Sequence, residues 1–166
     1  MAKTGSILLA IDTIVVIAIE IKDAVGYGRV RMRYIRDASG DMLVPFVCDV
    51  VSPGATVQTD GWGGYNELQK NGYVHQKKLM SSSDDPAHVS MPGVHRIASL
   101  LKRWILGTHQ GSVSAEHLQS YLEEFTFRFN RRSSRSRGLV FRRLLEQAVV
   151  TGPIIETEIA HGFKWQ

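Results

Sequence analysis

Ile14-Val-Val-Ile-Ala-Ile-Glu-Ile21 and Arg29-Val-Arg-Met-Arg-Tyr34 are two strand-like runs joined through a Gly26-Tyr-Gly28 turn. The first run is rich in β-branched residues and almost continuously apolar, which is typical of a strand buried on both faces. The second run alternates strictly, so one face is apolar and the other carries three arginines. Together they predict an antiparallel hairpin whose first strand lies inside a sheet.

Helices and short strands alternate along the rest of the chain. Asp37 is expected to be the N-cap of a helix that closes at Pro53-Gly54, and residues 55–59 are expected to form a short strand. The other expected elements are a short helix from Gly61, a strand over 73–77, a polar loop over 81–91, and helices over 94–106, from Ser114 onward and over 139–150. No domain-sized linker interrupts them, which predicts one α/β unit.

The composition is that of a globular protein. With 166 residues, 43% hydrophobic and 22% charged, collagenous, disordered and polytopic membrane proteins are unlike this chain. Asp12 and Glu20 interrupt the apolar run from Ile7 to Ile21, which argues against a membrane span or a signal peptide. The single cysteine, Cys48, excludes an internal disulfide and a thiolate zinc site; we expect it to be a buried helical residue. These features predict a soluble, cytoplasmic protein.

Basic charge is concentrated in the C-terminal half. The segment from His95 to Arg143 holds ten Lys and Arg against three Asp and Glu. Within it, seven arginines and no acid lie between Arg128 and Arg143. Such a run is often only a solvated face, but a cluster of one sign repels itself unless an anion is near, so we favour contact with nucleic-acid phosphates. The arginines at 29, 31 and 33 are either a second such contact or protection of an edge strand.

One carboxylate and one helix carry the candidate chemistry. Asp60 follows a predicted strand and precedes glycines, where α/β sheets commonly place function, although it can equally cap the next helix. His95 and Lys102 are seven positions apart, so at about 100° per residue their side chains differ by about 20° on the helix. They either share a cleft, where the lysine would hold a phosphate, or lie on a solvated helix edge. The local sequence leaves both interpretations open.

Four segments, taken in order, resemble a known family. From about Ile14 to Val150 the chain is similar to the ISXO-type domain of insertion-sequence transposases, members of the DDE superfamily with a ribonuclease H-like fold. The matching segments are Thr59-Asp-Gly-Trp-Gly-Gly-Tyr65, Val94-His-Arg-Ile-Ala-Ser-Leu-Leu-Lys-Arg-Trp104, Gly107-Thr-His-Gln-Gly111 and Glu123-Glu-Phe-Thr-Phe-Arg-Phe-Asn-Arg-Arg132. The resemblance implies an α/β, ribonuclease H-like mixed sheet flanked by helices. We expect this catalytic domain over residues 1–150 and a weakly ordered tail over 151–166.

The resemblance also implies a chemistry. In the family, carboxylates hold two divalent ions that activate a nucleophile and stabilise the leaving oxygen of a phosphodiester. Asp60 would be the second acidic ligand, His95 would occupy the third position, often Glu in the superfamily, and Lys102 would contact the DNA backbone. Mg²⁺ or Mn²⁺ is the expected cofactor, Mn²⁺ suiting the imidazole better. The expected DNA-binding residues are Lys102, Arg103, Arg128, Arg131, Arg132, Arg135 and Arg137.

The chain departs from the family at its start. The family's first catalytic Asp lies on a strand that precedes the one matched to Ile14–Ile21, and only Met1 to Thr13 are present for it. Asp12 ends an apolar stretch, but only Thr13 separates it from the next run, too little for a hairpin loop. We therefore expect the first strand to be missing or incomplete, the domain to be truncated at its N-terminus, and the first acid to be absent; the role of Asp12 stays open.

Two functions follow from these expectations. The first is a DNA transposase that cleaves and joins strands, working as a homo-oligomer on the element ends and the target, associated with the nucleoid. The second is a catalytically inactive, DNA-binding remnant that inhibits intact copies; a metal-dependent nuclease acting on RNA is a distant third. Trp62 and Tyr65 are either core residues or a stacking platform for an unpaired base near Asp60.

Overall fold

The computed structural model describes residues 2–9, 13–22, 26–78, 91–110, 113–150 and 152. Contacts within the chain divide it into two compact units, Met1–Ser112 and Val113–Gln166, and each is described by itself. The expected tail over 151–166 lies outside the described residues except for Gly152, and the expected domain over 1–150 stays a prediction.

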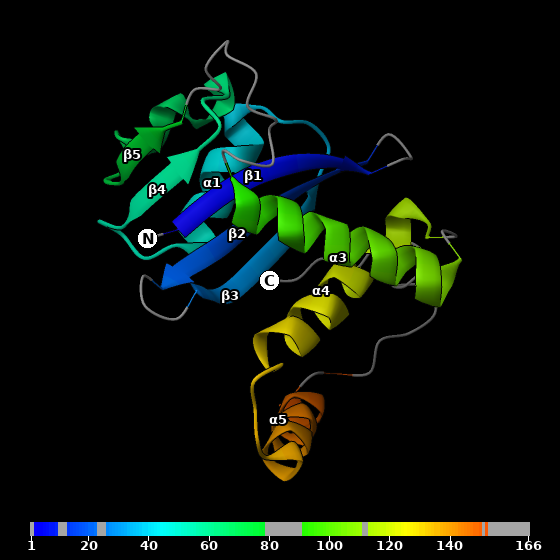
Figure 1. Cartoon of the computed structure of the whole chain (residues 1–166). Coiled ribbons are helices and arrows are strands. Elements are labelled where there is room, and N and C mark those ends of the chain that lie inside the picture. The colour runs from blue at the N-terminus through cyan, green and yellow to red at the C-terminus, as the bar shows by residue number, and fades with distance from the viewer. Residues whose placement is uncertain are drawn as a thin grey trace. The chain divides into compact units, whose positions relative to one another are not determined.

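The first unit is built on a five-stranded sheet in the order β3-β2-β1-β4-β5 (Figure 1). Its strands are β1 (Ala2–Leu9), β2 (Thr13–Lys22), β3 (Gly26–Ile35), β4 (Thr56–Thr59) and β5 (Val74–Lys77). The first three pair antiparallel, whereas β4 runs parallel to both β1 and β5. The sheet is therefore mixed, as expected.

The first strand is present, and the expectation that it is missing is wrong. Ala2–Leu9 pairs with β2 along its whole length, from Ala2 opposite Glu20 to Leu9 opposite Thr13. The sequence pattern carries the first apolar stretch through Ile11 to Asp12, which leaves only Thr13 for the connection. The strand instead ends at Leu9, so three positions separate β1 from β2, a length that hairpins commonly use. Those three residues, Asp12 among them, lie outside the described part of the chain.

The β2–β3 hairpin is confirmed, with one irregularity. The strand register shifts between Ile19 and Ile21, and there the carboxylate of Glu20 accepts the backbone N–H of Arg29 at 2.9 Å. This hydrogen bond lowers the pKa of Glu20 because it favours the charged form. Gly28 leaves the room for it, since a Cβ at that position would overlap the Glu20 carboxylate.

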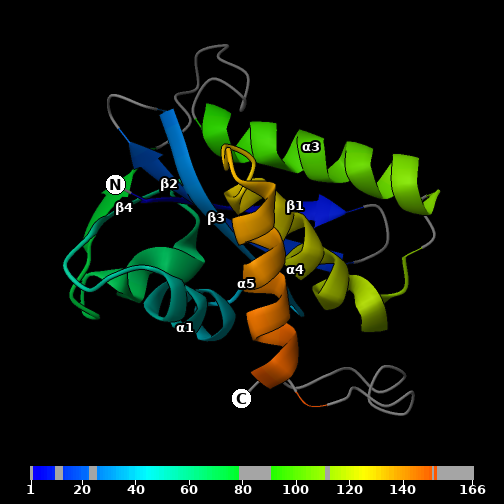
Figure 2. The ribbon, with the colours of Figure 1, turned by 90° about the horizontal axis from the view of Figure 1, so that it is seen from below.

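Helices cover both faces of the sheet. On one face, α1 (Gly40–Val50) and the 3-10 helix η1 (Gly63–Leu68) enclose a core with β2 and β4. On the other face, α3 (Pro92–His109) packs against β1 and β2 (Figure 2). The apolar side of α3 is buried at Val94, Ile97, Leu101 and Ile105.

Two details of α1 differ from expectation. Asp37 does not cap the helix: its Oδ1 accepts the N–H of Ser39 at 2.9 Å, and Ser39 is the N-cap residue. Cys48 is helical but exposed, because the buried side of the helix is formed by Leu43, Phe46 and Val47. The residue after Val47 is turned by about 100° away from that side.

Over its described residues, 113–150 and 152, the second unit contains two helices, α4 (Ala115–Asn130) and α5 (Arg137–Val150). Ser114 is the N-cap residue of α4, as expected, and Leu118, Leu122 and Phe125 are buried. By contrast, α5 has no buried residue. None of the helices in the described ranges is long and apolar enough to cross a membrane.

Candidate functional site

Asp60 lies where the sequence predicts it, immediately after β4. It is exposed, and its Oδ1 accepts the N–H of Trp62 at 3.1 Å. Trp62 is the N-cap residue of η1, and Gly61 between them has φ 86°, a conformation that favours glycine. The carboxylate thus stabilises the turn into η1. This is the structural role of Asp60 that the sequence left open, together with a chemical role.

The residue before Asp60 is fixed from the neighbouring strand. Thr59 is wholly buried, and its Oγ1 lies 2.9 Å from Nε2 of His75 on β5. The N–H of Gly61 points at the same hydroxyl at 3.4 Å. Burial lowers the pKa of His75, with the nearby charge of Lys77 acting in the same direction; both favour the neutral form of the imidazole. This pair anchors the backbone on both sides of Asp60.

Strand β1, which pairs with β4, brings no acid to Asp60. In the parallel register Lys3 is level with Gln58, so Asp60, two residues on, is level with Gly5. Residues 2–9 read Ala-Lys-Thr-Gly-Ser-Ile-Leu-Leu, without Asp, Glu or His. Moreover, no group of three His, Cys, Asp or Glu that could hold a metal occurs among the residues that the structure describes. These donors do not fit a complete two-metal site.

Helix α3 carries the other two candidate catalytic residues. His95 lies in its first turn and is half-buried, whereas Lys102 and Arg103 are exposed two turns on. Gly93 allows the start of the helix to approach β3, because a Cβ there would lie 2.6 Å from the ring of Tyr27. No hydrogen bond or ion pair joins Asp60, His95 and Lys102 to one another in the described chain, so their grouping into one site stays a prediction.

The two aromatic candidates for base stacking differ in exposure. Tyr65 is wholly buried in the core between η1 and α1, which leaves it no face for a base. Trp62 is 56% exposed, and its indole N–H donates to the carbonyl of Ala38 at 2.7 Å. The ring is therefore held in place beside the turn that contains Asp60 while part of it faces solvent.

The arginines of the second unit differ in the contacts that they make. Two of them lie over aromatic rings of α4: the guanidinium carbon of Arg131 is 3.7 Å from the centroid of Phe127, and that of Arg132 is 3.9 Å from the centroid of Phe129. Each also donates to a backbone carbonyl. Arg135 and Arg137 are exposed. A guanidinium held over a ring is oriented in advance and keeps its charge toward solvent.

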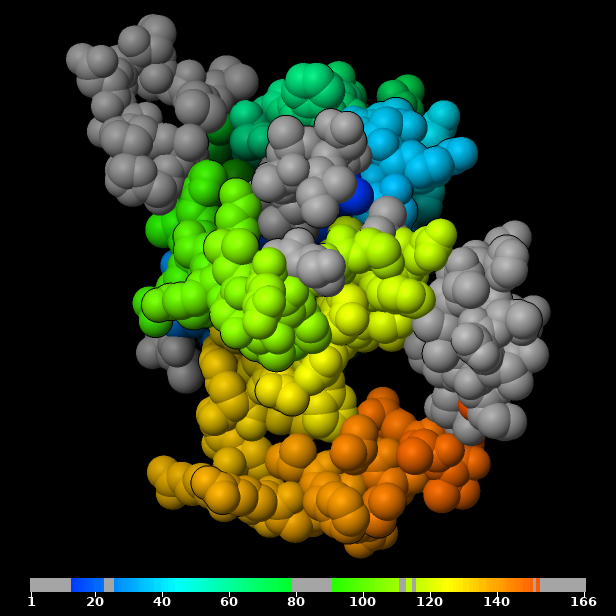
Figure 3. Space-filling model, turned by 90° about the vertical axis from the view of Figure 1, so that its right-hand side faces the viewer, coloured from blue at the N-terminus to red at the C-terminus, as the bar shows by residue number. Residues whose placement is uncertain are grey.

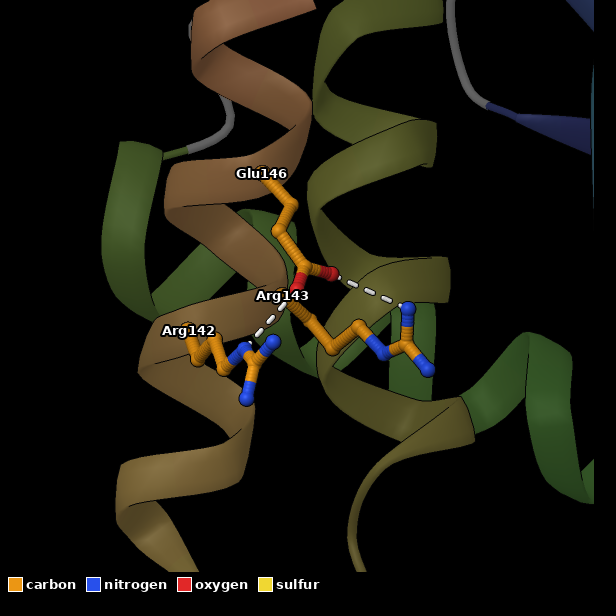
Figure 4. A network of polar contacts seen from close by, with 3 residues as sticks. All are labelled: Arg142, Arg143 and Glu146. Carbon is orange, nitrogen blue, oxygen red and sulfur yellow. Dashed lines mark hydrogen bonds and ion pairs between the residues drawn. The ribbon is translucent and has the colours of Figure 1, made fainter.

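Three further arginines of this unit have carboxylate partners. Arg128 pairs with Glu124 at 2.7 Å, and Arg142 and Arg143 both pair with Glu146, at 2.9 and 3.0 Å (Figure 4). The arginines without an acidic neighbour in sequence, from Arg131 to Arg137, are thus the stronger candidates for phosphate contact.

One of the three arginines on the face of β3 makes contacts that hold the fold together. Arg33 pairs with Asp49 of α1 at 2.9 Å and lies over the ring of Phe46 at 5.3 Å. Arg29 and Arg31 instead line a cavity of about 390 Å³ with Glu20 and Lys22 at the end of α1. Since β3 is an edge strand, both expectations for this face, a second phosphate contact and protection of the edge, stay open.

Comparisons with known proteins agree with this architecture. Residues 8–130 match the model of a family described as ISXO2-like transposase domain. The fold is similar to the crystal structure of the catalytic core domain of BIV integrase, with a TM-score of 0.55 and 12% sequence identity over 89% of this chain and 95% of that one. No curated protein matches the chain. The fold is accordingly α/β and ribonuclease H-like.

Proposed function

Because this chain belongs to the ISXO2-like transposase family, we propose that it acts in DNA transposition by holding DNA on the arginines of its second unit. The observation that carries the proposal is the placement of Arg131 and Arg132 over the rings of Phe127 and Phe129, followed by exposed Arg135 and Arg137. Family membership makes DNA the relevant anion.

Phosphate recognition explains why these arginines lie together. Each cation that neutralises a DNA phosphate releases a condensed counterion, which makes affinity fall with salt concentration. The rings of α4 reduce the conformational freedom that the guanidinium groups lose on binding. Arg128, paired with Glu124, contributes less net charge. Lys102 and Arg103, exposed on α3, are proposed as a further contact in the first unit.

For strand cleavage and transfer, the proposed catalytic residues are Asp60, His95 and Lys102. The family generally uses divalent metal ions, and such ions would supply nucleophile activation and charge stabilisation at the phosphodiester. Asp60 and His95 are the proposed ligands for Mg²⁺ or Mn²⁺. The donors among the described residues do not complete such a site.

The second candidate function is a catalytically inactive, DNA-binding member that inhibits intact copies. The observation that favours it is the composition of β1: the strand next to β4 is present but carries no acid. A chain that occupies the element ends, or that pairs with an intact copy, lowers transposition without cutting DNA. Because transposition brings two DNA ends together, both candidates call for more than one copy of the chain on DNA.

Salt-dependent DNA binding tests the proposal. Replacing Arg131, Arg132 and Arg135 by Ala is expected to weaken binding to duplex DNA and to flatten the plot of log affinity against log salt by about 0.9 per lost contact. The matched control replaces Arg142 and Arg143, which Glu146 already pairs, and is expected to change the slope less per charge removed. Equal slopes for the wild type and the triple variant contradict phosphate contact at this segment.

A further inference from the structure

A cavity of about 390 Å³ lies in the first unit, where the sheet meets the end of α1. Arg31 is level with Ala18 in the register of β2 and β3, and residues directly opposite each other in an antiparallel pair share a face. Ala18 belongs to the core that α1 covers. Arg31 and, two residues earlier, Arg29 therefore lie on the face of the sheet that carries α1.

The charged residues that line this cavity are three cations and one acid: Lys22, Arg29, Arg31 and Glu20. The carboxylate of Glu20 is already engaged, because its Oε2 accepts the backbone N–H of Arg29 at 2.9 Å. The next arginine of the strand, Arg33, pairs with Asp49 at 2.9 Å. Among the described residues, no ion pair joins the three cavity cations to an acid, and all three are exposed. The cavity therefore offers an excess of positive charge to a ligand.

Two roles within the fold do not account for the three cations. Protection of an edge strand calls for charge on β3, whereas Lys22 belongs to β2, which has a neighbour on both sides. The end of α1 attracts cations through its free carbonyl groups, but the carbonyl of Val51 accepts from the hydroxyl of Tyr73 at 3.0 Å. Arg31 donates to the carbonyl of Val30 at 3.2 Å, and in the described chain none of the three cations donates to α1. A ligand with negative charge explains their grouping better.

We propose that this cavity binds a phosphate ester, at a site separate from Asp60. Guanidinium groups hold phosphate oxygens through two parallel hydrogen bonds, and a lysine adds a point charge. Apolar side chains of Val50, Val51 and Ala55 form another part of the wall. Such a wall suits the sugar that carries the phosphate, and its low dielectric strengthens the attraction of the cations.

The cavity and Asp60 lie at opposite ends of β4. Ala55, which lines the cavity, directly precedes the strand, whereas Asp60 directly follows it. Five residues at about 3.3 Å each place the two positions about 16 Å apart. The phosphate held in the cavity is therefore not the one that Asp60 would act on, and the cavity serves binding.

The phosphate is that of a DNA backbone, a source that rests on the proposed function. A free nucleotide presents the same chemistry and is the other source. The volume of about 390 Å³ lies within the range of 300–1,000 Å³ that is typical of small-ligand sites. It has room for a phosphate with its sugar. A backbone contact of this kind adds affinity that depends on salt and not on base sequence.

DNA affinity measured against salt concentration tests the cavity. The double variant Arg29→Ala/Arg31→Ala is expected to bind duplex DNA about tenfold more weakly or worse, because a hydrogen bond to a charged group is worth at least a factor of ten. Two lost contacts at 0.9 each flatten the plot of log affinity against log salt by about 1.8. Lys70→Ala is the control, since Lys70 is an exposed cation that Glu67 already pairs at 2.7 Å.

Ser52→Glu is a second variant that keeps all three cations. Ser52 is exposed and lines the cavity, so an acid there is expected to repel the phosphate and to weaken DNA binding about tenfold as well. The result does not depend on whether the double alanine variant folds. Equal losses in Lys70→Ala and in the cavity variants overturn the inference, because they would reflect net charge alone.

A titration without DNA separates the two sources of the phosphate. The probe is a deoxynucleoside monophosphate, with the matching nucleoside as the control that lacks the phosphate, and NMR follows the backbone amides of Glu20, Arg31 and Val51. Saturable shifts that the cavity variants lose, together with an unchanged DNA affinity, assign the site to a free nucleotide. If neither DNA affinity nor monophosphate binding changes in the cavity variants, the inference is wrong.

The triple variant at Arg131, Arg132 and Arg135 separates this inference from the proposed function. That segment, gold between the yellow α4 and the orange α5 in Figure 3, lies at the surface of the second unit. A salt slope that falls in the triple variant alone, without monophosphate binding, overturns the cavity site and leaves the proposed function intact. A slope that falls in the cavity variants alone supports the cavity and contradicts phosphate contact by the second unit.

Discussion

Thr59 Oγ1 lies 2.9 Å from His75 Nε2, so the last residue of β4 is joined by its side chain to β5. Thr59 is wholly buried, and Asp60 follows it directly. The position of Asp60 therefore depends on a polar pair as well as on the strand ladder. Any role of Asp60 in binding or chemistry therefore depends on the Thr59–His75 pair for the position of its backbone.

Thr59→Val is expected to destabilise the protein by about 1 to 3 kcal/mol, the typical cost of leaving a buried polar group without its partner. Val keeps the shape of Thr but removes the hydroxyl that faces His75. Chemical denaturation measures the change. Thr59→Ser is the control, because it keeps the hydroxyl and loses only a methyl group, for about 1 kcal/mol. If Val is tolerated as well as Ser, the hydroxyl does not contribute.

His75 is expected to make stability depend on pH below neutrality. Its pKa in the folded chain is lowered by burial and by Lys77, so the unfolded chain binds the proton more readily. The stability that the neutral imidazole contributes is complete above the ordinary pKa near 6.5. It is lost as the pH falls through the lower pKa of the folded chain.

The measurement is the free energy of unfolding from pH 7 downward in the wild type and in His75→Gln. The wild type is expected to lose more stability than the variant over that interval. A proton titration of the imidazole in the folded chain gives a second readout. A titration at or above 6.5, or equal losses in the two proteins, contradicts the assignment.

Much of the fold could be predicted from the sequence because burial and periodicity are local signals. The run Ile14–Ile21 lies in β2, and the alternation of Arg29–Tyr34 lies in β3, since each pattern is fixed by which face of a strand is buried. The first strand was missed for a different reason. Residues 2–9 include Lys, Thr, Gly and Ser. This segment is a strand because it pairs in register with β2, and that pairing is not a local signal.

The site was predictable only in part. The position of Asp60 after a strand follows from local pattern, and so do the helical positions of His95 and Lys102. The link between His75 and Thr59 does not, because it depends on β4 and β5 running parallel in one register with both side chains on one face. For the same reason Cys48 was misjudged: the buried side of α1 is set by what packs on it.

Adjacent glycines in η1 are expected to respond differently to substitution. A Cβ at Gly64 would lie 2.6 Å from the carbonyl oxygen of Ala38 and 2.8 Å from Leu43, so Gly64→Ala must move backbone. We expect a loss of about 1 to 3 kcal/mol, as for overpacking. A Cβ at Gly63 would meet only Asn66, at 3.9 Å, and Gly63→Ala is the control. Thermal unfolding measures both, and equal midpoints would contradict the close packing.

Asp60 is expected to be essential for any strand nicking that the chain performs with Mg²⁺ or Mn²⁺. Two variants separate its chemical role from its structural one. Asp60→Ala removes both the charge and the acceptor for the N–H of Trp62. Asp60→Asn keeps an oxygen that can accept the hydrogen bond and removes only the charge, which a metal ion needs from its ligand. Both variants are expected to abolish nicking, and Asp60→Asn to keep the stability of the wild type.

Nicking of supercoiled DNA, measured beside DNA binding and unfolding, distinguishes the outcomes. Full nicking by Asp60→Asn would show that Asp60 serves the turn into η1 and that the chemistry lies elsewhere. A wild type that binds DNA with the expected salt dependence but does not nick it favours the inhibitor, in keeping with a β1 that carries no acid. In that case, adding the chain to an intact transposase of the same element is expected to lower strand transfer, and the triple arginine variant to lower it less.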